Sequence, residues 1–186
     1  MVFLLDASTS VTPRLYSKEK DFVKSLITHF NISPSGTRGS AIIYGNASFT
    51  IADFSEPNLI GKLDNAPLLK TPRKMDKALK HAARTLKSAG RAGRRIVILL
   101  TTGTQRSGGE SFEGAKQQLQ SVRAQTFVVA VGRQTDIRQL YYIVNRPNNI
   151  YRVEPTDDLQ RQSRPIAKSI HDKPGMKQQH NYTITQ

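Results

Sequence analysis

The chain has 186 residues, no cysteine, and 28 lysine and arginine residues against 14 aspartate and glutamate residues, which gives a formal net charge of +14. A chain of this length is expected to fold as one domain with a sizeable core, and the lack of cysteine excludes disulfide bonds and thiolate metal sites. Its apolar runs are too short to span a membrane. The charge favours acidic partners, whereas the absence of tryptophan and the scarcity of other aromatic residues argue against a nucleic-acid platform built on base stacking.

The N-terminal stretch combines a strand with a polar loop. Residues 2–5 are all apolar, as expected of a strand that is buried on both faces. Asp6, Ser8 and Ser10 follow on alternate residues, where an extended backbone points them the same way. Such oxygen donors suit Mg²⁺, Mn²⁺ or Ca²⁺. The alternative is that the two serines only cap the helix that follows.

Helices and strands alternate along the rest of the chain. Periodicity and turn residues predict helices over residues 12–30, 57–63, 74–88, 112–122, 137–144 and 157–169, and strands over 40–44, 49–54, 96–100, 126–131 and 150–153. We expect Thr12 to cap the first helix ahead of Pro13. The pattern predicts an α/β sandwich with helices on both faces of a mostly parallel sheet, in which the strands at 2–5 and 96–100 are central neighbours.

The composition changes near the C-terminus. From Lys173 onward the chain is polar, contains Pro174 and Gly175, and shows no periodicity. We therefore expect a folded domain over residues 1–171 and a disordered tail or linker remnant over 172–186. No signal peptide is visible and the chain begins directly at the first strand, so we expect one domain of a larger protein.

A series of basic residues recurs at steps of three and four: Arg73, Lys77, Lys80, Arg84, Lys87 and Arg91. On a helix these residues form one stripe opposite the alanine and leucine face. Charge runs are usually solvated surfaces, but here Asp76 is almost the only balancing acid. The stripe is therefore a candidate surface for binding a polyanion.

Three Asn-x-Ser/Thr triplets begin at Asn31, Asn46 and Asn181. Each is a glycosylation acceptor only if the protein is secreted, and Asn46 lies in a predicted hairpin turn, the most accessible of the three places. No nucleophilic triad, phosphate-binding loop or pair of catalytic carboxylates can be assembled from the sequence, so we do not expect an enzyme.

Several stretches together, in this order, resemble the von Willebrand factor type A domain, also called the A or I domain: residues 3–10, 20–26, 33–38, 77–79, 97–103, 129–132 and 150–153. The similarity runs from Val2 to about Ile170 and is greatest to domains of the extracellular matrix, as in collagen VI, the matrilins, and the matrix proteins of byssus and shell. It implies a Rossmann-like sheet of five parallel strands and one antiparallel edge strand. It also implies a metal-ion-dependent adhesion site at the carboxyl ends of the strands.

The resemblance implies a set of metal ligands that this chain matches only in part. Its first element, Asp-x-Ser-x-Ser, is present at residues 6–10. The family's threonine corresponds to Thr71 by its loop, but strict spacing from Ala78 places Arg73 there. The family's second aspartate is replaced by Thr102. The candidate metal ligands are therefore Asp6, Ser8, Ser10, Thr71 and Thr102.

Loss of one carboxylate is expected to weaken the binding of a hard cation. Either the site holds Mg²⁺ or Ca²⁺ weakly, with an acidic group of the partner completing the coordination, or Ser8, Ser10 and Thr102 form a metal-free hydrogen-bond network. We expect an extracellular, secreted binding domain without enzymatic activity or membrane insertion. Its partner is then a matrix protein such as collagen, bound at the metal site, or an acidic glycan, acidic protein or mineral, bound by the basic stripe.

Overall fold

The computed structural model describes residues 1–186 except 34, 91, 106–108, 156–158 and 174–186. The strands are β1 (Val2–Asp6), β2 (Ser40–Tyr44), β3 (Ser48–Ala52), β4 (Arg95–Thr101), β5 (Ala124–Val131) and β6 (Ile150–Val153). The α-helices are α1 (Pro13–His29), α2 (Leu59–Asp64), α3 (Met75–Ser88), α4 (Gly109–Ser121), α5 (Ile137–Ile143) and α6 (Ser163–Asp172), and two 3₁₀ helices are η1 (Pro147–Asn149) and η2 (Leu159–Gln162).

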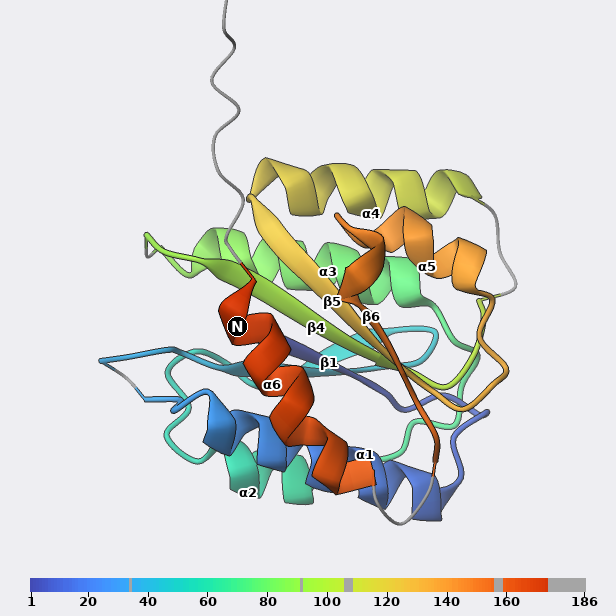
Figure 1. Ribbon diagram of the computed structural model, residues 1–186, viewed down its shortest axis with the longest axis horizontal. Helices are drawn as coiled ribbons and strands as arrows, with labels where there is room; N and C mark the ends of the chain where they lie inside the picture. Colours follow the sequence, from blue (N-terminus) through green and yellow to red (C-terminus); the bar gives the residue numbers. More distant parts are fainter. Residues whose placement is uncertain (34, 91, 106–108, 156–158, 174–186) are drawn as a thin grey trace, which may run out of the picture.

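The six strands form one sheet in the order β3-β2-β1-β4-β5-β6. Neighbouring strands are parallel, except that β3 pairs antiparallel with β2 at one edge. β1 and β4 are adjacent at the centre and fully apolar along most of their length, which confirms the predicted arrangement (Figure 1). Because β1, β2, β4 and β5 are parallel, the loops after these strands meet at the same edge of the sheet.

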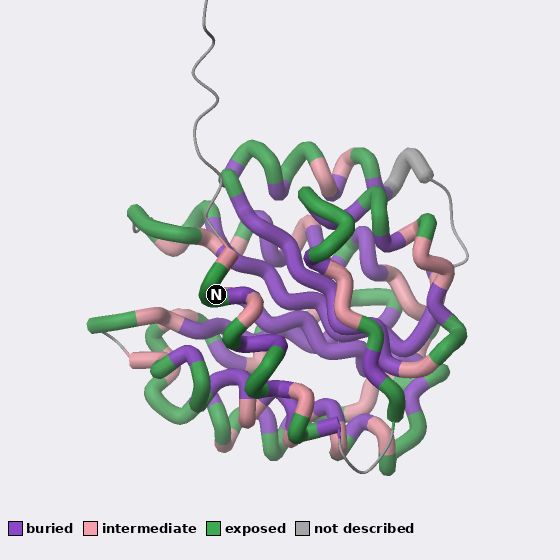
Figure 2. The backbone as a smooth tube through the Cα atoms, viewed as in Figure 1, coloured by how far each residue is buried: buried purple, intermediate pink, exposed green. Residues whose placement is uncertain are grey.

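Helices cover both faces of the sheet (Figure 1). One core lies between the sheet and helices α1, α2 and α6, and the other between the sheet and helices α3, α4 and α5. The central strands are therefore buried on both sides, whereas the outward faces of the helices are exposed (Figure 2). This three-layer arrangement is the predicted fold class.

Helix α1 begins as its sequence predicts. The side chain of Thr12 accepts a hydrogen bond from the amide of Leu15 at 3.2 Å, and Pro13 occupies the first turn. Thr12 is therefore the cap of this helix. The alternative interpretation, in which Ser8 and Ser10 serve only as the cap, is wrong.

Some boundaries differ from the predicted ones. α2 begins at Leu59 and α4 at Gly109. The predicted last helix is split into η2 and α6, which places Pro165 in the first turn of α6, where its missing amide hydrogen leaves no gap. α6 extends to Asp172, since the Arg94 guanidinium donates to the carbonyl oxygens of Ile170 at 2.9 Å and His171 at 3.4 Å.

The tail was predicted over residues 172–186, and residues 174–186 of it lie outside the described part of the chain. Within the described part, no helix has both the length and the apolar character needed to cross a membrane.

Candidate functional site

Asp6 is the centre of a polar cluster at the carboxyl end of β1. Its side chain is fully buried. One carboxylate oxygen, Oδ1, accepts a hydrogen bond from the amide of Ser8 at 3.1 Å. The other, Oδ2, accepts from the amide and the hydroxyl of Thr102, both at 3.1 Å, and from Nε of Arg73 at 2.7 Å. The loops after β1 and β4 and the segment before α3 thus converge on one carboxylate.

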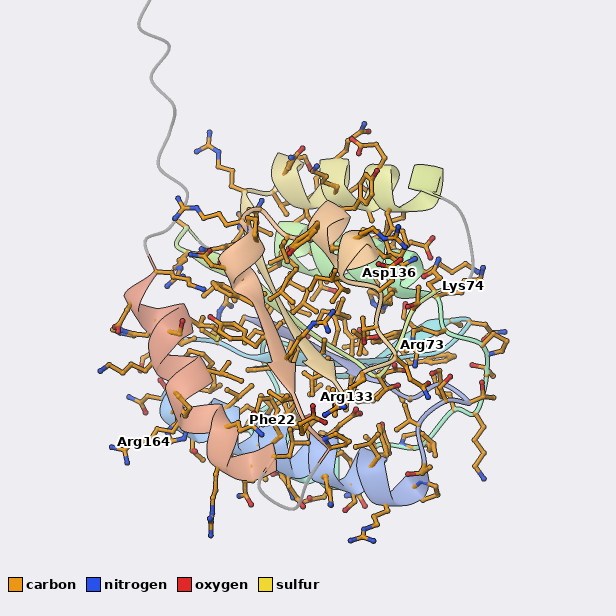
Figure 3. All side chains as sticks on the ribbon, turned by 45° about the vertical axis from the view of Figure 1, so that its right-hand side comes forward. Phe22, Arg73, Lys74, Arg133, Asp136 and Arg164 are labelled. Carbon is orange, nitrogen blue, oxygen red and sulfur yellow. The ribbon has the colours of Figure 1, made fainter. Side chains whose placement is uncertain are left out.

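The Arg73 guanidinium fills the space beside Asp6. Besides its ion pair with Asp6, its Nη2 donates to the hydroxyl of Thr102 at 2.5 Å and its Nη1 donates to the carbonyl of Thr104 at 3.3 Å. The side chain is only 6% exposed. Gly103 makes room for it, because a Cβ atom at that position would lie 2.8 Å from Nη1. Figure 3 shows Arg73 at this edge of the sheet, on the side where Lys74 and Asp136 also lie.

This arrangement does not fit a divalent ion. Oδ2 of Asp6, the oxygen that faces Thr102, already binds a cation of the chain itself, and hard cations need several free oxygen ligands. In the described part of the chain, no group of three or more His, Asp or Glu side chains is placed to hold a metal. Arg73 stands at the position that spacing from Ala78 assigned to the family's threonine, and Thr102 replaces a second carboxylate.

The other predicted ligands lie around this cluster rather than in it. Thr71 pairs with Ser8 in an isolated β-bridge, and its hydroxyl accepts from the amide of Asn46 at 3.0 Å. The Ser8 hydroxyl is buried, with no hydrogen-bond partner among the described residues, while Ser10 is exposed. Of the five predicted ligands, the structure joins Asp6 and Thr102 through their side chains, and Ser8 to Asp6 through its backbone amide.

Gly45 lies close to Thr71, since a Cβ atom there would be 2.0 Å from the Thr71 hydroxyl. The loop after β2 therefore needs glycine at this position to pack against the loop before α3.

Glu19 is a buried acid near the cluster that the sequence analysis missed. It is fully buried on α1, and neither carboxylate oxygen has a hydrogen-bond partner among the described residues. Burial raises the pKa of Glu19 well above its usual value, the Asp6 carboxylate raises it further, and Arg73 opposes both effects. A neutral, protonated Glu19 is the expected form, because an unpaired carboxylate is costly to bury.

The predicted basic stripe holds only in part. Lys77, Arg84 and Lys87 are exposed on α3 and Lys80 is half-buried. Arg73 does not belong to the exposed stripe, because α3 begins at Met75 and the Arg73 side chain turns inward to Asp6. Arg91 lies outside the described residues. Four basic residues therefore form the stripe, here called the α3 stripe: Lys77, Lys80, Arg84 and Lys87.

The acid within the α3 segment does not neutralise it. Asp76 is buried and accepts a hydrogen bond from the side-chain amide of Gln105 at 2.7 Å. In the described part of the chain, no carboxylate forms an ion pair with a member of the α3 stripe.

Two of the three glycosylation triplets lie in the described part of the chain. Asn46 is exposed in the turn between β2 and β3, as predicted from the sequence, and Asn31 is exposed just after α1. Asn181 lies outside the described residues.

Known proteins resemble this chain in sequence over most of its length. Residues 1–164 match the sequence model of the von Willebrand factor type A domain. Human von Willebrand factor A domain-containing protein 2 is 27% identical over 140 residues, which cover 71% of this chain and 18% of the human protein. The chain thus spans less than a fifth of that relative.

Solved structures show the same fold at low sequence identity. The mussel byssus proximal thread matrix protein 1 is 18% identical and superposes with a TM-score of 0.79 over 89% of this chain and 45% of that one. A structure of the mussel protein with a zinc-occupied metal-ion-dependent adhesion site gives a TM-score of 0.77 at 17% identity, covering 89% and 46% of the two chains. A von Willebrand factor type A protein of Catenulispora acidiphila gives 0.73 at 17% identity, covering 89% and 41%.

Proposed function

The chain belongs to the von Willebrand factor type A domain family, and we propose that it is a non-enzymatic binding module of a secreted extracellular-matrix protein that works without a divalent metal ion. One observation carries this proposal: the Arg73 guanidinium binds Asp6 at 2.7 Å, where the family's metal site is expected. The cation of the site is then part of the polypeptide.

The partner that fits this module best is an acidic polymer bound by the α3 stripe. Its four side chains repeat at steps of three or four along one helix, so the Cβ atoms of neighbouring members are about 5–6 Å apart. No carboxylate in the described part of the chain pairs with them. A flexible polyanion can contact several at once, with an affinity that falls as salt rises.

Adhesion to a collagen-like protein through the edge of the sheet is the second candidate. In this mechanism an acidic side chain of the partner would complete the coordination of a metal held by Asp6. The ion pair between Arg73 and Asp6 opposes it, because both the carboxylate and the space beside it are taken. Any binding of collagen by this domain is therefore expected to be insensitive to chelator.

The test is a binding panel of heparin and collagen, measured with Mg²⁺ and with EDTA. Heparin binding should be unchanged by EDTA and should weaken about tenfold or more when Lys77, Lys80, Arg84 and Lys87 are changed to glutamine together, because each exposed contact contributes a fraction of a kcal/mol. Binding of either probe that disappears in EDTA would refute the metal-free mechanism.

A matched control removes four other positive charges. Lys24, Lys62, Arg133 and Arg138 each already pair with a carboxylate, at 2.6, 3.7, 3.3 and 3.1 Å. Changing these four to glutamine lowers the net charge equally and should weaken heparin binding much less. Equal losses in the two quadruple variants would mean that the charge acts diffusely and that the α3 stripe is only a solvated face.

A further inference from the structure

A second basic surface lies on the opposite face of the sheet, in a groove between the end of α1 and the outer side of α6. The groove has a volume of about 480 Å³. Six residues line it: His29, Arg164, Pro165, Ala167, Lys168 and His171. Four of them carry basic side chains and none is acidic. We call it the α1–α6 groove. The sequence does not predict it, because His29 on α1 lies at least 135 residues from the other members, which all lie on α6.

The basic residues of α6 share one side of the helix. Arg164, Lys168 and His171 stand at steps of four and three, so they follow one another over about 10 Å along the helix axis. The apolar side of α6, with Ile166 and Ile170, packs on the core beneath the sheet. Figure 3 shows Arg164 on α6 pointing away from the body of the domain, far from Arg73.

The basic side chains of the groove are available to a ligand. Arg164, Lys168 and His29 are exposed, and in the described part of the chain no carboxylate forms an ion pair with any of them. His171 lies 3.3 Å from Asp172, through its Nδ1 atom. Three of the four basic side chains therefore form no ion pair with a carboxylate of the described residues.

The chemistry of the lining selects the class of ligand. The lining contains no Phe, Tyr or Trp and no large aliphatic side chain, so the groove lacks the apolar anchors that bury a protein partner, and its only rings are the imidazoles of His29 and His171. What it offers is a row of donors, of which the arginine fork suits oxyanions with several oxygens. From this we infer that the α1–α6 groove is a second binding site for a sulfated polysaccharide, so that the domain holds two acidic chains on opposite faces of its sheet.

A domain that holds two polysaccharide chains can bridge them, and this bridging depends on where the two basic surfaces lie. The α3 stripe belongs to a helix that packs on one face of the sheet, and α6 packs on the other (Figure 1). A single stiff chain cannot follow both surfaces without passing around the edge of the sheet. Only the bridging rests on the proposed function of the α3 stripe; the groove site stands without it.

The first experiment isolates the groove. Binding of a labelled heparin oligosaccharide is measured by fluorescence anisotropy over a range of salt, for the parent and for Arg164→Gln/Lys168→Gln in the background of the α3 quadruple glutamine variant. The groove change should weaken the remaining affinity about three- to tenfold and lower the slope of log affinity against log salt by about one to two. The control, Arg133→Gln/Arg138→Gln in the same background, removes the same charge from ion-paired residues.

Three outcomes overturn the groove site: equal losses in the groove and control variants, no residual heparin binding in the α3 quadruple variant, or a larger groove-dependent loss with poly-glutamate or single-stranded DNA than with heparin.

The second experiment tests bridging by light scattering with long heparin chains. The parent should raise the scattering near charge balance, and either the groove variant or the α3 variant alone should abolish the rise while still binding. Scattering that persists in both variants would refute bridging through these two surfaces, whereas failure of the α3 variant alone to weaken binding would refute only the proposed function.

Discussion

Replacing Arg73 by methionine should destabilise the domain strongly, because it leaves the buried Asp6 carboxylate without its counter-charge. Asp6 is fully buried and the Arg73 side chain is 6% exposed, so water cannot replace the lost partner without opening the site. Breaking a buried ion pair by removing one member costs about 3–5 kcal/mol. Asp6 keeps three donors from Ser8 and Thr102, which places the expected loss near the lower end, at about 3 kcal/mol.

A loss of this size is large for a single domain, whose total stability is about 5–15 kcal/mol. It corresponds to a fall in the melting temperature of about 6–12 °C for a chain of this length. Urea unfolding followed by circular dichroism measures the free energy, and differential scanning calorimetry measures the melting temperature. The matched control is Arg133→Met, since Arg133 also binds a carboxylate through its Nε atom, at 3.3 Å, but is 87% exposed. That control should unfold at the same urea concentration as the parent.

A second variant separates loss of charge balance from loss of packing. Asp6→Asn/Arg73→Met removes both charges, so it should be more stable than Arg73→Met alone. A loss below 1 kcal/mol for Arg73→Met, or a double variant less stable than the single one, would refute the view that Arg73 neutralises Asp6.

Two further predictions concern the same region. Glu19→Gln should become more stable relative to the parent as the pH rises, because folding raises the pKa of Glu19 above its ordinary 4.5. The unfolded chain then releases this proton at lower pH than the folded one, so the parent loses stability above about pH 4.5 and the variant does not. Urea unfolding at pH 4 and pH 7 checks this, and a difference in unfolding free energy between parent and variant that is the same at both pH values contradicts it. The double variant Arg73→Thr/Thr102→Asp should bind Mg²⁺ in isothermal titration calorimetry, since it removes the guanidinium and adds a carboxylate. Thr102→Asp alone should show no gain in Mg²⁺ binding, because Arg73 would neutralise the new carboxylate. Mg²⁺ binding by this single variant would show that Arg73 does not exclude a metal.

The fold could be predicted from the sequence because its strongest signals are local. The strands β1, β4 and β5 each contain a continuous apolar run, and such runs are typical of a parallel sheet covered by helices on both faces. The cap of α1 at Thr12 also depends only on neighbouring residues. By contrast, the C-terminal end of α6 could not be predicted from neighbouring residues, because Arg94 contacts it from a distant segment.

The candidate site could be predicted only in outline. The sequence marked Asp6 and Thr102 and showed that a carboxylate is replaced, but the direction of the Arg73 side chain depends on Gly103 and Thr104, about thirty residues further along the chain. Helical spacing alone therefore assigned Arg73 to the exposed stripe. Glu19 was missed although its helical spacing predicts its burial. It stands three residues before Phe22 and four before Val23, on the apolar side of α1.

The covalent attachment of the cation at Asp6 sets how this site responds to its surroundings. A diffusible ion occupies a site according to its concentration, whereas a guanidinium on the same chain has a high effective concentration at the carboxylate whenever the domain is folded. Occupancy is then governed by the folding equilibrium, and neither dilution nor ion exchange can change it. Under the proposed metal-free mechanism, the loops around Asp6 therefore keep one state at any calcium or magnesium concentration, and these ions cannot switch the domain.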